Sequence, residues 1–198
     1  MRRVRGKLIA IEGVDQAGKK TQAEFLAREV RKSGRRVSLW NFPDYRTPLG
    51  GELSAYLKGK IRLDTHALHL LYAANKWEAV EDLRARLDRG EVVVVNRYSP
   101  SNLAYGMAHD LPRSWLASLE EGLPKPDVVV VLDIPPRVSL ERKRKGRDVH
   151  EANLSYLRRV GREYRSLARR FGWKIVDGAQ HAAVVRQRVW EKVASTLS

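Results

Sequence analysis

The chain has 198 residues, of which 43% are hydrophobic, and no apolar run approaches the ~18 residues of a membrane span, so we expect one cytoplasmic domain without a membrane partner. It contains no cysteine, which excludes disulfides, thiolate metal sites and a cysteine nucleophile. The formal net charge of +15 attracts polyanions such as nucleotides or nucleic acid, although many of the basic residues could equally lie on solvated helix faces.

Hydrophobic patterns alternate between the two periodicities of strands and helices. Strands are predicted, in chain order, at residues 7–12, 36–40, 92–95, 128–132 and 173–176. Helical patterns are predicted at residues 19–33, 63–89, 101–109, 113–120, 152–170 and 182–197. The valine runs at 92–95 and 128–132 are apolar throughout, as in strands that are covered on both faces. The alternation predicts an α/β fold, a five-stranded parallel sheet flanked by helices on both faces.

A phosphate-binding loop lies between the first predicted strand and the first predicted helix. It matches seven positions of the P-loop pattern with Gly13, Val14, Asp15, Gln16, Ala17, Gly18 and Lys19. In such a loop the backbone N–H groups and the helix N-terminus surround the phosphates of ATP, and Lys19 would reach the β- and γ-phosphates. The alternative is a glycine-rich turn that binds nothing, and the strand before it and the helix after it argue against that.

The eighth position of the loop departs from the pattern. It should be Ser or Thr, whose hydroxyl binds magnesium, but the chain has Lys20 there and Thr21 one residue later. A helix rotates by about 100° per residue, so Thr21 cannot be assumed to occupy the same place. Lys20 is either a second cation for the phosphates or a solvent-facing residue, and the sequence leaves both open.

Several segments resemble the thymidylate kinase family of P-loop nucleoside-monophosphate kinases. Residues 12–22 resemble the opening of these kinases, which carries an Asp at the position of Asp15 and a Thr-Gln pair afterwards. Further matches follow in the same order as in the family: Phe42-Pro43 with Arg46, Thr47 and Gly50; the segment 69–78; Asn96-Arg97-Tyr98 with Ser101, Ala104 and Tyr105; the segment 123–127; Leu132-Asp133; and Arg142. The resemblance covers about residues 7–177.

This resemblance implies a P-loop NTPase three-layer fold and a single kinase domain with a lid at about residues 141–152. The implied reaction is phosphoryl transfer from ATP to dTMP, giving ADP and dTDP for dTTP synthesis, with Mg²⁺ as the cofactor of ATP. The implied partners are the two nucleotides and a second copy of the chain in a homodimer, without a dedicated nucleic-acid partner.

The resemblance also implies which residues bind dTMP: Asp15, Phe42, Pro43, Arg46, Tyr72, Lys76, Arg97, Ser101 and Tyr105. Tyr72 would stack on the pyrimidine, unless it is one more core aromatic. The guanidinium of Arg97 suits the acceptor phosphate, with a structural ion pair as the alternative. Lys76 stands where the family usually has Arg and would donate to a thymine carbonyl. Asp15 and Tyr105 are expected near the deoxyribose, unless they serve the loop instead, as Asp commonly does by accepting from turn N–H groups.

The implied catalytic residues are Lys19, Arg97, Arg142 and Asp15. In this family a transition-state arginine comes from the loop or from the lid, and Gln16 occupies the loop position, so the lid must supply it. Arg142, Arg144 and Arg147 are the candidates, of which Arg142 aligns best with the residue that touches ATP. A solvated basic helix end is the alternative.

The metal-binding positions are unusual. Asn96 replaces the Asp that the family has near the metal, so that only Thr21 and Asn96 remain as indirect magnesium ligands. Two other functions stay open: a kinase with a broader or shifted acceptor, such as dUMP or another deoxynucleotide, and a catalytically weakened paralogue that binds nucleotides or nucleic acid.

Overall fold

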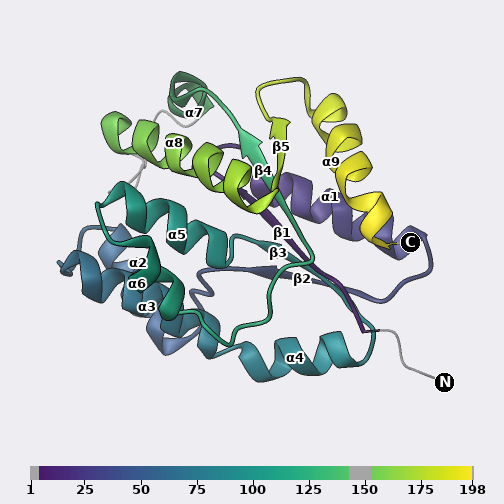
Figure 1. Cartoon of the computed structure of the whole chain (residues 1–198), viewed down its shortest axis with the longest axis horizontal. Helices are drawn as coiled ribbons and strands as arrows, with labels where there is room; N and C mark the ends of the chain where they lie inside the picture. The colour runs from purple at the N-terminus through teal and green to yellow at the C-terminus, as the bar shows by residue number, and fades with distance from the viewer. Residues whose placement is uncertain (1–4, 143–152, 198) are drawn as a thin grey trace.

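A computed structural model describes residues 5–142 and 153–197 (Figure 1). Its sheet has five strands, β1 (Leu8–Gly13), β2 (Val37–Asn41), β3 (Val92–Asn96), β4 (Val128–Asp133) and β5 (Lys174–Asp177). All pairings are parallel, in the order β2-β3-β1-β4-β5. The predicted five-stranded parallel sheet is therefore confirmed, and each predicted strand lies within one or two residues of an observed one.

The three central strands form the apolar centre of the fold. Every residue of β1 is buried, and β3 and β4 are buried except for their last residue. β2 and β5, at the edges, are half-buried or exposed over most of their length. This gradient explains why the continuous valine runs belong to β3 and β4, since only a strand covered on both faces is apolar at every position.

Helices cover both faces of the sheet. The helices of the described residues are α1 (Lys19–Lys32), α2 (Pro48–Leu57), α3 (Thr65–Trp77), α4 (Val80–Asp88), α5 (Ser99–Ala108), α6 (Arg113–Ser118), α7 (Pro136–Arg142), α8 (Leu154–Phe171) and α9 (Ala182–Leu197). α1 and α9 pack together on one face, and α5 and α8 pack together on the other (Figure 1). No helix among the described residues combines the length and the apolar character that crossing a membrane requires.

Two short helices were not predicted from the sequence. α2 starts at a proline, and the side chain of Thr47 caps it by accepting a hydrogen bond from the Gly50 N–H. α7 likewise starts at a proline, Pro136. α2 has ten residues and α7 has seven, and both are too short for a clear helical periodicity in the sequence. The long helical pattern at 63–89 is divided between α3 and α4.

The topology brings two loops together at the carboxyl ends of the strands. β1 ends at the P-loop, and β3 ends one residue before Arg97. The two strands are neighbours, with Ile11 opposite Asn96. Ligands of open α/β sheets bind at this edge, so the register alone places Arg97 beside the P-loop.

Candidate active site

The P-loop depends on residues with a left-handed backbone. Gly13 has a φ of 134° and Gly18 a φ of 90°. A Cβ atom on Gly13 would lie 2.4 Å from the carbonyl oxygen of Leu132, so only glycine fits there. Lys19, almost fully buried, donates a 2.7 Å hydrogen bond to the carbonyl of Val14 and lies over the loop. Lys20 and Thr21 are exposed at the start of α1.

α7 holds the P-loop from its outer side. The buried hydroxyl of Ser139 donates to the carbonyl of Asp15 at 2.8 Å. The guanidinium of Arg142 donates to the carbonyl of Gln16 at 3.1 Å and to that of Gly178 at 3.0 Å. Arg142 therefore lies against the predicted ATP site. Arg144 and Arg147, and most of the predicted lid, lie outside the described residues.

Arg97 lies at the centre of a polar cluster between β3, the P-loop and α5. Its φ is 65°, and its backbone N–H donates to the carbonyl of Ile11 at 3.1 Å. Its guanidinium forms an ion pair with Asp15 and donates to Tyr105 Oη at 3.0 Å and to Ser101 Oγ at 3.2 Å. The Tyr105 hydroxyl donates to Asp15 Oδ2 at 2.7 Å. Four of the predicted acceptor residues thus belong to one hydrogen-bonded cluster.

Glu12 supports this cluster from below. Its fully buried carboxylate accepts hydrogen bonds from the Tyr98 N–H at 2.7 Å, from Ser101 Oγ at 2.5 Å and from the Tyr164 hydroxyl at 2.8 Å. Burial raises the pKa of Glu12, although these hydrogen bonds and the charge of Arg97 act in the opposite direction. Sequence reasoning gave no role to Glu12 or Tyr164. The available signal was an acidic residue inside an otherwise apolar strand.

A cavity opens beside Arg97 and contains most of the predicted acceptor residues. It is lined by Asp15, Phe42, Pro43, Tyr45, Leu57, Tyr72, Lys76, Arg97, Tyr98, Ser101, Asn102 and Tyr105. Arg46 is the one predicted dTMP contact outside this lining. It forms a bidentate ion pair with Asp44, and 89% of its side chain is exposed.

Lys76 enters the cavity wall from α3 as a nearly buried cation. Its ammonium donates to the carbonyl of Tyr72 at 2.7 Å and lies 2.8 Å from Glu120 Oε1. The aromatic rings of Phe42, Tyr72 and Tyr98 line the same cavity. The combination offers flat apolar surfaces and a hydrogen-bond donor, which together suit a planar heterocycle with a carbonyl group.

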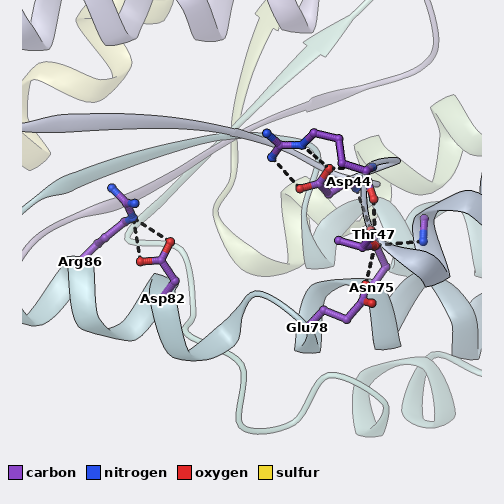
Figure 2. Close-up of polar contacts among 8 residues, drawn as sticks. Asp44, Thr47, Asn75, Glu78, Asp82 and Arg86 are labelled. Atoms are coloured by element: carbon purple, nitrogen blue, oxygen red, sulfur yellow. Dashed lines mark hydrogen bonds and ion pairs between the residues drawn. The ribbon is translucent and has the colours of Figure 1, made fainter.

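The loop that carries Phe42 and Pro43 is tied to α3 by the buried side chain of Asn75 (Figure 2). Asn75 Oδ1 accepts from the Asp44 N–H at 2.8 Å, and Asn75 Nδ2 donates to Thr47 Oγ1 and Glu78 Oε2, each at 2.9 Å. Thr47 Oγ1 also donates to Glu78 Oε2 at 2.7 Å. The cavity wall is therefore fixed by hydrogen bonds as well as by packing.

Replacing Asn75 with alanine will lower the free energy of unfolding by about 1–3 kcal/mol, because buried partners lose their hydrogen bonds. The loop will also loosen, so the cavity should bind the predicted acceptor, dTMP, more weakly and with a higher KM. Asp82→Ala is the matched control, because Asp82 pairs with Arg86 (Figure 2) and 53% of its side chain is exposed, and an exposed pair contributes less than about 1 kcal/mol. Denaturant unfolding and initial rates measure both effects, and equal losses in the two variants would contradict the assignment.

Asn96 retains one unused oxygen at the edge of the sheet. Its Nδ2 donates to Asn41 Oδ1 at 2.9 Å, whereas its Oδ1 is buried and accepts no hydrogen bond from the described residues. Within residues 5–142 and 153–197, no three His, Cys, Asp or Glu side chains form a group that could hold a metal ion. A metal at this site would therefore depend mainly on ligands that the nucleotide supplies.

Comparison with known proteins identifies the family. The family profile described as thymidylate kinase matches residues 11–189. The thymidylate kinase of Danio rerio is 37% identical over 197 residues, covering 98% of this chain and 92% of that protein. The thymidylate kinase of Homo sapiens is 35% identical over 188 residues, covering 93% of this chain and 88% of that protein. The solved structure of the Candida albicans thymidylate kinase superposes with a TM-score of 0.87 at 28% identity, covering 98% and 93%. The chain therefore belongs to the thymidylate kinase family.

Proposed function

We propose that this chain transfers the γ-phosphoryl group of ATP to the phosphate of dTMP, giving ADP and dTDP, and so serves dTTP synthesis. Family membership supports this activity. The observation that carries it is the position of Arg97, whose side chain is 16% exposed and forms an ion pair with Asp15 at the mouth of the P-loop. One cation there can hold an acceptor phosphate beside the donor phosphates.

The cavity binds the acceptor nucleotide. Tyr72 and Phe42 supply flat surfaces for the base, and Lys76 donates to a base carbonyl. Arg97 binds the phosphate. Its contacts with Asp15, Tyr105 and Ser101 hold the guanidinium in a fixed orientation before the ligand binds. Asp15 and Tyr105 lie at the side of Arg97 and meet the sugar.

Phosphoryl transfer then needs no protein nucleophile. An oxygen of the dTMP phosphate attacks the γ-phosphorus in line, and ADP leaves with the bond electrons. The P-loop N–H groups and Lys19 bind the β- and γ-phosphates, while Arg142 contacts ATP from the end of α7. The positive charges of Lys19, Arg97 and Arg142 compensate the charge that develops on the transferred group.

We also propose that the reaction uses Mg²⁺ bound mainly by the phosphates of ATP. The unused Oδ1 of Asn96 is the kind of hard oxygen that Mg²⁺ accepts, and the exposed hydroxyl of Thr21 is a second, indirect ligand. The ion supplies charge neutralisation at the phosphates. Neither residue carries a negative charge, so the protein's own hold on the ion is weak.

Restoring the usual residue types at both positions tests this metal assignment. In Lys20→Ser with Asn96→Asp, we expect higher turnover at low magnesium, by about tenfold, because one charge-assisted contact is gained. Steady-state rates across a magnesium titration measure the effect, and the single variants show which position contributes. Rates that are the same in the double variant and the wild type at every magnesium concentration would contradict it.

An ADP-release assay with ATP and a panel of deoxynucleoside monophosphates tests the proposed function directly. We expect dTMP to be the best acceptor, ahead of dUMP. Titration calorimetry that shows nucleotide binding without ADP formation would instead indicate a catalytically weakened paralogue. We further propose that the enzyme works as a homodimer in the cytoplasm, by analogy with its family, and sedimentation at several concentrations tests the dimer.

A further inference from the structure

The cavity wall contains a buried ion pair, and one of its members, Glu120, has no role in the proposed function. The ammonium of Lys76 and the carboxylate of Glu120 lie 2.8 Å apart, with only 4% and 6% of their side chains exposed. Lys76 comes from α3, and Glu120 follows α6. Removing two charges from water is costly, so this pair is weak evidence for stability, and the geometry that it imposes is the role considered for it here.

The backbone around Glu120 is fixed against the helices that flank Lys76. Trp77, the residue after Lys76, donates its indole N–H to the carbonyl of Leu119 at 3.0 Å. Arg84 of α4 donates to the carbonyl of Gly122 at 2.9 Å. Gly122 has a φ of 96°, and a Cβ atom there would lie 3.1 Å from the Trp77 ring. Glu120 is thus held between two anchored residues and presents its carboxylate at a defined place.

This arrangement constrains a side chain that is flexible by nature. A lysine ammonium has no planar fork, and its long chain can place the charge in many positions. Here the ammonium donates a hydrogen bond to the Tyr72 carbonyl, and Glu120 lies beside it as an ion-pair partner, although neither carboxylate oxygen of Glu120 accepts a hydrogen bond from the described residues. Lys76 also lines the cavity, and an ammonium can only donate to a ligand that binds there. An ammonium that is held in one place can donate a hydrogen bond to a carbonyl group of a base, but it cannot pair with an amino group, which is also a donor.

We propose that Glu120 is a positioning residue that fixes the Lys76 ammonium and thereby makes the cavity select a pyrimidine with a carbonyl at position 4. This rests on the proposed function, because it assumes that a pyrimidine nucleotide occupies the cavity. Glu120 acts only through Lys76. Without Glu120 the enzyme keeps Arg97 and the P-loop, so the chemical step persists while base discrimination falls.

The test compares dTMP with 5-methyl-dCMP, which carries an amino group instead of the carbonyl at position 4 and lacks the proton on N3. Dissociation constants by calorimetry give a discrimination ratio that does not require turnover, and ADP release gives kcat and KM. We expect Glu120→Gln to lower this ratio about tenfold, mainly by weakening dTMP binding, with little change in kcat. The matched control is Glu121→Gln, which neutralises the adjacent, exposed carboxylate and should keep the wild-type ratio.

Two further variants guard against a simple folding defect. Lys76→Met removes the donor, and Lys76→Met with Glu120→Leu replaces the whole pair by apolar residues, a change that buried pairs often tolerate. Both should show the same low ratio, because Glu120 has no role once Lys76 is absent. A ratio that differs between them, or a wild-type ratio in a folded Glu120→Gln, would overturn the proposal. A wild-type chain that binds dTMP selectively but forms no ADP would instead contradict the proposed function alone.

Discussion

Replacing Lys19 with methionine will reduce kcat for dTMP phosphorylation by about 10²–10³-fold, the usual effect of removing a preorganised charge at a transition state. The ammonium of Lys19 already lies over the P-loop through its bond to Val14, so it needs little rearrangement to meet the phosphates. Methionine has a similar length and no charge. KM for dTMP should change much less, because Lys19 is not part of the acceptor cavity.

Lys32→Met is the control for this substitution, since Lys32 ends the same helix with its side chain 73% exposed. It should keep the wild-type rate. Initial rates of ADP release under saturating nucleotides measure kcat in both variants, and thermal unfolding shows whether either one has lost stability. Comparable kcat values for the two variants would exclude Lys19 from the transition state.

Replacing Arg97 with lysine will lower kcat/KM for dTMP by about 10²–10³-fold although the charge is kept. The arginine fork reaches Asp15, Tyr105 and Ser101 at once, and an ammonium cannot keep these contacts and bind a phosphate in a fixed orientation. The loss should appear in both KM and kcat, because the same group binds the acceptor and orients it for attack.

Arg28→Lys, at an exposed position of α1, is the corresponding control and should have wild-type kinetics. Calorimetry with ATP separates the two sites, because donor binding should be almost unchanged in Arg97→Lys. An Arg97→Lys enzyme with wild-type kcat/KM for dTMP would show that Arg97 is only a structural partner of Asp15.

The sequence predicted those parts of the fold that depend on local patterns. The valine runs predicted β3 and β4 because a strand covered on both faces is apolar throughout, and the P-loop was visible because its glycines are required by backbone geometry. The helices α2 and α7 were not predicted, because each is short and begins at a proline, a residue that usually indicates a loop.

Residues that act through distant partners were harder to predict. Glu12 and Glu120 act through residues that are distant from them in the sequence, Tyr164 for Glu12 and Lys76 for Glu120, so no local pattern marks either of them. Arg46 stays a prediction as a dTMP contact, because the family resemblance alone suggests it and the side chain is paired with Asp44 at the surface. The lid arginines Arg144 and Arg147 remain predictions.

The left-handed backbone of Arg97 is unfavourable for stability, whereas the proposed activity requires the arginine side chain at this position. An L-residue with a side chain in this conformation costs about 1–2 kcal/mol relative to glycine, which adopts it freely. Glycine at position 97 would remove this cost, but it would also leave the Asp15 carboxylate without its ion pair and the cavity without the proposed acceptor-binding group. Substitutions intended to raise the thermal stability of this enzyme should instead be made first in the edge strand β5, whose exposed residues do not line the cavity.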